Sequence, residues 1–361
     1  MRSRPAMSAP RHVVVCGAGV MGAATAYFLA RRGVEVTVVE RSGVACAASG
    51  KSGGFLALDW CDDSPLGPLA RASFALHAEL AKSIAIDYGY RRVDTFMLAA
   101  RERGPVRGEH RVAPPHWLDG AGVVTAALGS TETTAQIHPA SFTAALIEAA
   151  PARVHLGVVQ EIVQRDGAAV GVRVDGATLA ADAVVLALGP WTSHVAGRLL
   201  LRIRGLKGYS VTLDAAGVPP HALFVDYRTA DGRTLEPEIF PRPDGSVYVC
   251  GMADPQPLPD SPEGVVVDDA ACAVLARAAG RVSTTLAAAP ITRRQACYRP
   301  VTDDGLPLIG RVPGMSHAYV ATGHGPWGML NAPGTGFALA ELIVDGAATT
   351  IDLRAFDPRR S

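Results

Sequence analysis

The chain opens with two short apolar runs that enclose a helix-like segment. Residues 12–16 (HVVVC) and 34–40 (VEVTVVE) are rich in β-branched residues, which is typical of buried parallel strands. Between them, the segment from Val20 to Gly33 predicts a helix that ends at the glycine. The pattern therefore predicts a strand–helix–strand unit with parallel strands.

Helical and strand-like segments continue to alternate along the rest of the chain. The expected elements are a glycine-rich loop over 47–55, a helix over 65–88, a strand over 91–101, a short helix over 138–150, three strands joined by glycine turns over 157–191, a mostly strand-like region over 204–292, and a strand, a glycine loop and a helix over 317–346. No repeat or long linker separates them. We expect an α/β protein in which segments of one domain interrupt another.

Composition excludes several classes of partner. The 361 residues carry 34 basic and 34 acidic side chains, so we expect no broad attraction to nucleic acid or anionic lipid. The six cysteines form no CxxC pair and no secretory signal is evident, which favours reduced thiols in the cytoplasm. No His, Cys, Asp and Glu residues have metal-ligand spacing, so no metal site is expected.

The apolar segment 13–30 is long enough to raise the question of a membrane span. Its glycines argue against a membrane span, because Gly17, Gly19 and Gly22 form a GxGxxG motif between the first strand and the first helix. In this motif the glycines allow a tight turn, close approach of a pyrophosphate and close packing of helix on strand. Glu40 ends the second strand, where a carboxylate can bind an adenosine ribose. The sequence thus predicts a dinucleotide site and no membrane span.

Three further stretches show which dinucleotide is expected. They are ASGKSGGF (48–55), ADAVVLALGPWT (181–192) and the C-terminal pair CYRPVTDDGLPLIG (297–310) and YVATGHGPWG (319–328). With the GxGxxG motif, they resemble the FAD-dependent D-amino acid oxidase superfamily, which includes glycine oxidase and monomeric sarcosine oxidase. GKSGGFLALDW and GHGPWGMLNAPGTG also resemble a fungal and plant group of FAD oxidoreductases.

The resemblance implies a Rossmann-type FAD-binding domain, of the glutathione reductase-like kind, beside a substrate domain built on a mixed or antiparallel sheet. Residues 1–95, 137–200 and 293–361 would form the discontinuous FAD-binding domain. Residues 96–136 and 201–292 would form the substrate-binding domain.

The resemblance also implies the residues that hold FAD. Val159 would place its backbone near the adenine, and the glycine loop before the last helix would face the pyrimidine end of the flavin. The positive end of that helix would stabilise an anionic reduced flavin. We expect the side chain of His324 to pack or hydrogen-bond rather than act as a base. The expected FAD-binding residues are Gly17, Gly19, Val20, Met21, Gly22, Glu40, Arg41, Ser49, Lys51, Ser52, Gly53, Val159, Gly189, Trp191, Gly323, His324, Gly325, Trp327, Gly328 and Met329.

On the substrate side, Arg299 stands where glycine oxidase and D-amino acid oxidase have the arginine that binds the substrate carboxylate. Its guanidinium matches a carboxylate in planar, bidentate geometry. The alternative is a structural pair with Asp303 or Asp304. Glu238 stands where glycine oxidase has a substrate-facing tyrosine. If Glu238 and Arg299 both face the substrate, they select a zwitterion or a substrate with a second amino group; alternatively, they pair with each other.

Two positions differ from monomeric sarcosine oxidase, and a third matches it although its neighbours resemble D-amino acid oxidase. Val249 replaces the oxygen-activating lysine, which leaves the electron acceptor open. Trp327 replaces a carboxylate-binding lysine, so a carboxylate must rely on Arg299. Cys297 aligns with the cysteine that links the flavin covalently in sarcosine oxidase, whereas the adjacent YRPV resembles D-amino acid oxidase, in which the flavin is not linked. A thioether needs an activated thiolate, so we expect non-covalent FAD.

The predicted function is oxidation of a C–N bond in a small amine or amino acid. Hydride would leave the carbon next to nitrogen for flavin N5, and water would hydrolyse the imine. Oxygen or another acceptor would then take the electrons. The alternatives are a flavin-dependent dehydrogenase with a non-oxygen acceptor, a non-catalytic FAD-binding assembly protein and an NAD-dependent dehydrogenase. Substrate and oligomeric state stay open.

Overall fold

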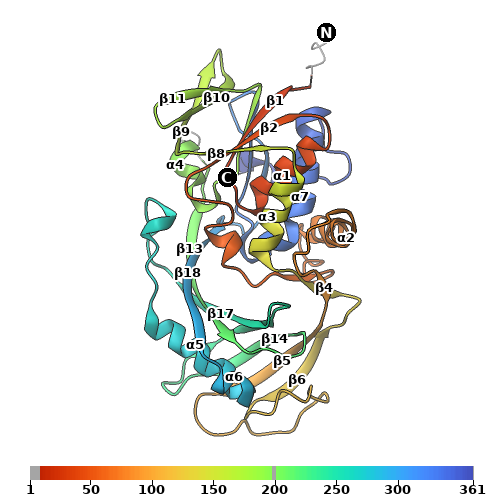
Figure 1. Cartoon of the computed structure of the whole chain (residues 1–361), viewed down its shortest axis with the longest axis vertical. Helices are drawn as coiled ribbons and strands as arrows, with labels where there is room; N and C mark the ends of the chain where they lie inside the picture. Colours follow the sequence, from red (N-terminus) through yellow and green to blue (C-terminus); the bar gives the residue numbers. More distant parts are fainter. Residues whose placement is uncertain (1–8, 197–200, 361) are drawn as a thin grey trace.

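The computed structural model describes residues 9–196 and 201–360, and two large sheets dominate it. A six-stranded sheet occupies one end of the molecule and an eight-stranded sheet the other (Figure 1). The first sheet has the order β19-β20-β12-β1-β2-β8 and is parallel except for β19. Its strands are β1 (His12–Cys16), β2 (Glu35–Glu40), β8 (Arg153–Leu156), β12 (Ala183–Leu186), β19 (Leu308–Arg311) and β20 (Ala318–Thr322).

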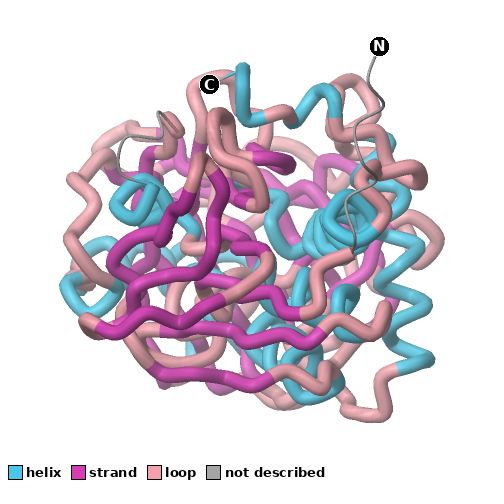
Figure 2. The backbone as a smooth tube through the Cα atoms, turned by 90° about the horizontal axis from the view of Figure 1, so that it is seen from above, coloured by secondary structure: helices cyan, strands magenta, loops and turns pink. Residues whose placement is uncertain are grey.

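The two faces of this sheet are covered by different partners. Val13 and Val15 pack on the helical face, and Val14 and Cys16 pack on the other, as the alternation of side chains along a strand requires. The helices on the first face are α1 (Val20–Ala30), α2 (Gly67–Ser83), α3 (Pro139–Ala149) and α7 (Gly328–Val344). The opposite face is covered by a small antiparallel sheet of β9 (Val159–Arg165), β10 (Ala168–Val174) and β11 (Ala177–Ala180), with α4 (Thr192–Ala196) beside it. Seen from above, helices lie directly against the strands (Figure 2).

The eight-stranded sheet is mostly antiparallel and carries its own core. Its order is β18-β13-β17-β16-β14-β5-β6, with β15 paired to β14, and only β14 and β5 run parallel. The strands are β5 (Asp94–Arg101), β6 (Val123–Gly129), β13 (Arg204–Asp214), β14 (His221–Arg228), β15 (Thr234–Leu235), β16 (Glu238–Pro241), β17 (Ser246–Asp254) and β18 (Ile291–Val301). A third small sheet, of β3 (Phe55–Ala57), β7 (Thr134–Gln136) and β4 (Arg91–Arg92), joins the two ends.

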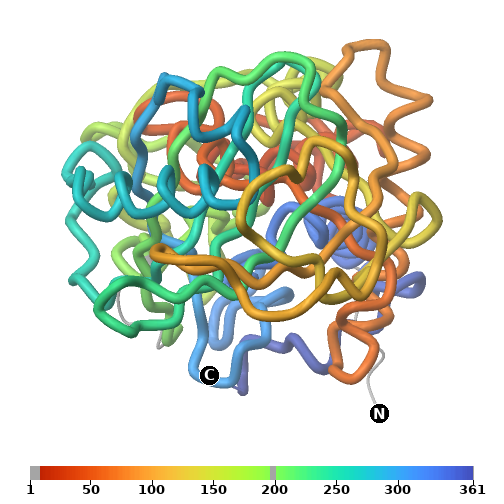
Figure 3. Tube along the Cα trace, turned by 90° about the horizontal axis from the view of Figure 1, so that it is seen from below, coloured from red at the N-terminus to blue at the C-terminus, as the bar shows by residue number. Residues whose placement is uncertain are grey.

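The prediction of an α/β protein with a parallel opening unit is confirmed, but the expectation of mostly strand over 204–292 is partly wrong. Helices α5 (Asp269–Val282) and α6 (Thr284–Ala288) lie within it and are drawn in cyan to blue in the view from below (Figure 3). Asp268 caps α5 by accepting hydrogen bonds from the N–H groups of Ala270 and Ala271. The helix buries residues at helical spacing against the sheet. They are Ala271, Cys272, Leu275, Ala278, Ala279 and Val282.

Two boundaries also differ from expectation. The helix expected over 65–88 ends at Ser83, because Ile84 is extended. The strand expected over 91–101 is divided into β4 and β5 at Val93. Among the described residues, no helix combines the length and the apolar character that a membrane crossing requires.

One buried histidine ties α2 to the start of α7. The Nε2–H of His77 donates to the carbonyl oxygens of Met329 at 3.0 Å and Leu330 at 3.2 Å. Its Nδ1 is buried and has no hydrogen-bond partner among the described residues. Burial lowers the pKa of His77 from 6.5 to about 4, so the imidazole stays neutral at pH 7.

We therefore predict that acidification weakens the fold before the carboxylates titrate. Between pH 6.5 and about 4 the unfolded chain binds a proton at His77 and the folded chain does not. The free energy of unfolding should fall by up to about 1.4 kcal/mol per pH unit for this imidazole. Urea unfolding at pH 7, 6 and 5 measures the slope. The variant His77→Gln should show a shallower pH dependence, and an unchanged slope would contradict the assignment.

Candidate functional site

A cavity of about 1070 Å³ is lined by residues from both large sheets. At one end it meets the turn between β1 and α1 and the end of β2. At the other it meets the faces of β14, β16, β17 and β18. The two ends of the cavity therefore differ in composition: one is rich in glycine, and the other is lined by aromatic and charged side chains.

Backbone geometry at the β1–α1 turn allows a close approach. Gly17 has a positive φ of 104°, and a Cβ on it would reach the carbonyl oxygen of Ala187. A Cβ on Gly22 would overlap the carbonyl oxygen of Gly17, so α1 packs directly on the turn. Gly19 is the N-cap of α1 and provides no capping side chain. The turn therefore offers backbone and the positive end of a helix to the cavity.

Glu40 is held in place by the same turn. Its Oε2 accepts a hydrogen bond from the Ala18 N–H at 2.8 Å, and its Oε1 accepts one from the Ser42 N–H at 2.9 Å. The side chain is 9% exposed and lines the cavity. Next to it, Arg41 pairs with Glu263 at 3.3 Å, so the loop that follows β17 reaches this end of the site.

The glycine-rich loop after β2 is held from the other sheet. Tyr248 donates its hydroxyl to the carbonyl oxygen of Lys51 at 2.6 Å, and Arg242 donates to that of Ser52 at 2.8 Å. A Cβ on Gly53 would overlap the ring of Phe240. Sequence reasoning missed Tyr248 and Arg242, because their partners are backbone atoms far away in the chain. The hydroxyl of Ser52 is buried without a hydrogen-bond partner among the described residues.

The structure brings nearly all of the predicted site residues to one cavity. Arg299, Glu238, Cys297 and all but two of the twenty expected FAD-binding residues line it. The two exceptions, Gly22 and Gly323, lie behind the lining. Gly22 lets α1 pack, and Gly323 turns the chain after β20 with a positive φ of 79°.

His324 points into the protein interior. Its Nε2 forms a hydrogen bond with the Thr335 hydroxyl at 3.0 Å, and burial lowers its pKa to about 3. It is therefore neutral and engaged in holding the loop against α7. The N-terminus of α7 has no side-chain cap, so its positive end is available near the His324–Met329 segment that lines the cavity.

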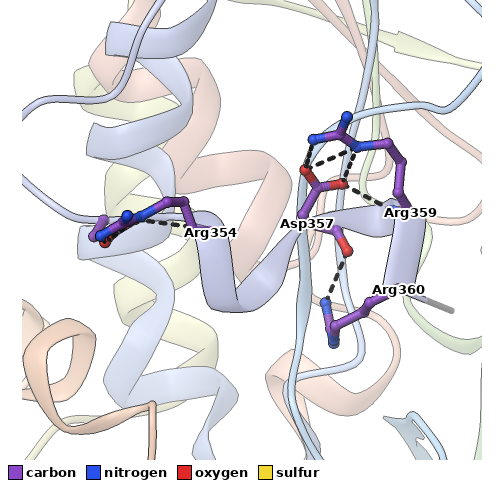
Figure 4. Close-up of polar contacts among 5 residues, drawn as sticks. Arg354, Asp357, Arg359 and Arg360 are labelled. Carbon is purple, nitrogen blue, oxygen red and sulfur yellow. Dashed lines mark hydrogen bonds and ion pairs between the residues drawn. The ribbon is translucent and has the colours of Figure 1, made fainter.

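Arg299 is free of the two aspartates that could have claimed it. Asp303 pairs with Arg204 at 2.9 Å, and Asp304 pairs with Arg360 at 2.8 Å. Arg360 also donates to the Asp357 carbonyl in the C-terminal turn, which fixes it for this role (Figure 4). The alternative of an Arg299 pair with Asp303 or Asp304 is therefore wrong. The Arg299 guanidinium lies beside Gly208 of β13, where a Cβ would be in ordinary contact with it at 3.7 Å.

Glu238 is the second charged group on this side. It lies opposite Phe224 of β14 and Cys250 of β17 in the sheet, and its Oε2 accepts a hydrogen bond from the Cys250 thiol at 3.4 Å. Burial raises the pKa of Glu238, while this hydrogen bond and the positive charge of Arg299 oppose the rise. The two charges influence each other without forming a contact ion pair among the described residues.

Cys297 lines the cavity from β18, two residues before Arg299. Burial raises the pKa of its thiol, although the charges of Arg299 and Lys51 oppose that rise. Lys51 itself donates to the carbonyl oxygen of Ala296 at 3.3 Å. The neutral thiol is the favoured form at pH 7, and that form is a poor nucleophile.

Comparison with known proteins identifies the class. The family model described as FAD dependent oxidoreductase matches residues 12–342. A protein of Schizosaccharomyces pombe, whose name proposes an oxidoreductase and gives no substrate, is 33% identical over 389 residues, covering 98% of this chain and 100% of the relative. The glycine oxidase of Geobacillus kaustophilus is 28% identical over 376 residues, covering 96% of each chain.

Solved structures agree with the sequence comparison. The crystal structure of the Geobacillus kaustophilus glycine oxidase superimposes with a TM-score of 0.79 and 25% identity, covering 98% of this chain and 100% of that one. L-proline dehydrogenase from P. horikoshii shares the fold, with a TM-score of 0.78 at 19% identity over 98% of each chain. The chain belongs to the DAO family of FAD-dependent oxidoreductases. The predicted family and fold are confirmed.

The β1–α1 turn provides a matched pair of variants. Gly22→Ala should lower the free energy of unfolding by about 3 kcal/mol, the upper end for overpacking, because the new Cβ overlaps the Gly17 carbonyl. Gly19→Ala should cost much less, since φ is −72° and its Cβ would meet only the Ser49 hydroxyl at 3.2 Å, which must shift by a few tenths of an ångström while it accepts from the Val20 N–H. Urea unfolding of both variants checks this. Equal stabilities would show that the helix does not pack on the turn as described.

Proposed function

We propose that this protein binds one FAD non-covalently in the cavity and oxidises a C–N bond of a small amine or amino acid. One observation carries the proposal: the N-termini of α1 and α7, neither of which is capped by the side chain of its own N-cap residue, and the carboxylate of Glu40 all meet one cavity that also contains Arg299. Two helix N-termini fit a pyrophosphate and an anionic ring, and Glu40 fits a ribose.

The donor set fits FAD in other respects. Lys51 and Ser52 lie on the glycine-rich loop that lines the cavity, and the Ser52 hydroxyl has no hydrogen-bond partner in the part of the chain that the structure describes. Val159 lines the end near Glu40, and Gly189 and Trp191 line it after β12. When bound, FAD supplies the two-electron chemistry by accepting the hydride from the substrate carbon. Burial keeps His324 neutral and raises the pKa of the Cys297 thiol, so neither side chain is activated for a covalent bond to the flavin.

The chain's own residues position the substrate. Arg299 would hold a substrate carboxylate through two parallel hydrogen bonds and so fix which face of the neighbouring carbon is presented. The aromatic side chains at this end keep bulk water away from the reacting bond. A neutral amine is the reactive form, and water hydrolyses the resulting imine.

We propose the same division into domains as the sequence indicates. All six strands of the six-stranded sheet fall within 1–95, 137–200 and 293–361, which supports these as the FAD-binding domain. The substrate domain comprises 96–136 and 201–292, and β18 runs across its last boundary. Residues 1–8, 197–200 and 361 of these ranges lie outside the described residues.

A non-oxygen acceptor is the second candidate. Val249 is fully buried in β17 and contributes no charge where an oxygen-activating lysine is expected from the resemblance. A flavin-dependent dehydrogenase that passes electrons to a quinone or a protein therefore remains the alternative to an oxidase. Peroxide measured during turnover in air distinguishes them.

The FAD proposal predicts a yellow protein whose colour moves entirely to the supernatant after acid precipitation. Glu40→Arg should abolish FAD binding, because a cation would replace the acceptor for the ribose hydroxyls and the partner of the Ala18 N–H. Glu35→Arg is the control, since it makes the same charge change at the exposed start of β2. A colourless native protein that binds NAD would refute the FAD proposal, and colour in the acid pellet would refute non-covalent binding.

The carboxylate role of Arg299 predicts selective loss of activity. Arg299→Ala should cost about 2–4 kcal/mol in kcat/KM for an amino acid substrate, the scale for leaving a charged group unpaired. The decarboxylated amine should lose far less. Arg204→Ala is the control, because Arg204 on β13 forms only an exposed pair with Asp303. Equal losses for both substrates would mean that Arg299 does not bind a carboxylate.

A further inference from the structure

Five aromatic rings line the same end of the cavity. Phe55 lies 5.0 Å from Trp60 and 5.1 Å from Phe224 between ring centroids, and Trp60 lies 5.0 Å from Phe224. Phe240 stacks on Phe55 at 5.7 Å, and Trp327 meets Trp60 at 6.3 Å. We call these five residues the aromatic wall. They come from β3, β14, β16 and two loops, so no single stretch of sequence shows them together.

Glu238 borders the aromatic wall. It is the direct cross-strand partner of Phe224, and Phe240 follows it two residues later on the same strand. Its carboxylate accepts a hydrogen bond from the Cys250 thiol, which is a weak donor. No cationic side chain of the described residues lies within ion-pair distance. An acidic group at the cavity surface is thus left without a cationic contact partner among the described residues.

Aromatic rings beside a carboxylate favour an organic cation as ligand. Aromatic faces attract cations through their quadrupole, most strongly where water is excluded, and they contact the alkyl groups of an organic ammonium well. A carboxylate beside them adds direct Coulomb attraction. A neutral apolar ligand would use the rings but would leave Glu238 desolvated and unpaired, which is costly.

We propose that Glu238 and the aromatic wall form a subsite for a second cationic nitrogen of the substrate, an alkylated ammonium group remote from the C–N bond that is oxidised. With Arg299 on β18 and Glu238 on β16, the substrate class is an amino acid or amine that carries its carboxylate toward one and a distal ammonium toward the other. This subsite rests on the proposed function for its place in the reaction, but it can be tested by binding alone.

The test compares two ligands of equal shape by calorimetry on the purified holoenzyme. One is 4-(trimethylammonio)butanoate, and the other is 5,5-dimethylhexanoate, in which carbon replaces the charged nitrogen. Both present a carboxylate for Arg299. We expect the cationic ligand to bind about tenfold more tightly, the range that a desolvated cation–π contact provides. Equal or tighter binding of the neutral ligand would overturn the proposal.

Variants locate the preference. Glu238→Gln should remove most of it while leaving binding of the neutral ligand within about twofold. Phe224→Leu should reduce it as well, because the apolar volume stays and the ring face is lost. Glu236→Gln is the control, since Glu236 also lines the cavity but is exposed. A preference that survives both Glu238→Gln and Phe224→Leu would refute the subsite.

Failure of this proposal and failure of the proposed function give different results. If FAD or amine oxidation is wrong, the protein is colourless or unreduced by amines, yet the ligand comparison still reports on Glu238. If only the subsite is wrong, the flavin is present and the cation preference is absent. Should Glu238→Gln fail to fold, the wild-type ratio and Phe224→Leu still decide.

Discussion

The close contact between Gly22 of α1 and the carbonyl of Gly17 is the constraint on which the site depends. It brings the helix onto the end of β1 with no side chain between them. In the same turn the Ala18 N–H donates to Glu40, which joins the ends of β1 and β2 through one carboxylate. The N-terminus of α1 and the carboxylate of Glu40 are therefore held side by side at the edge of the cavity.

The glycine-rich loop carries this placement to the second sheet. Its backbone is fixed by Arg242 and Tyr248, which belong to the β16–β17 hairpin. That hairpin also presents Glu238 and Cys250 to the cavity. The same hairpin therefore contacts both the glycine-rich loop and the end of the cavity that contains Glu238. The buried arginine over the Tyr248 ring adds a cation–π contact at 4.6 Å that stiffens this junction.

Sequence reasoning succeeded where the determinants are local. The β1–α1–β2 unit, the GxGxxG turn and Glu40 could be predicted from residues close together in the chain. The C-terminal glycine loop could be predicted because it directly precedes a helix in the sequence. It failed where distant residues decide. Helix α5 was not predicted, because its helical spacing of apolar residues lies among strand-like segments and its only start signal is the N-cap residue Asp268. The true partners of Asp303 and Asp304 are arginines on β13 and at the C-terminus, which no spacing rule connects.

The aromatic wall is another feature that sequence reasoning could not predict, because its residues are far apart in the chain. Each ring, considered alone, is an ordinary core residue, and only the cross-strand register of β14 and β16 places Phe224 beside Glu238. The register also decides the electrostatics. Two strands, β17 and β13, lie between Glu238 and the strand of Arg299, so the charges attract each other without neutralising each other in a contact pair. A cavity with two separated, opposite charges and an apolar surface between them favours a ligand with the complementary separation of charge. The spacing of strands in the sheet, rather than any one side chain, therefore sets the separation of the two charged groups in the cavity.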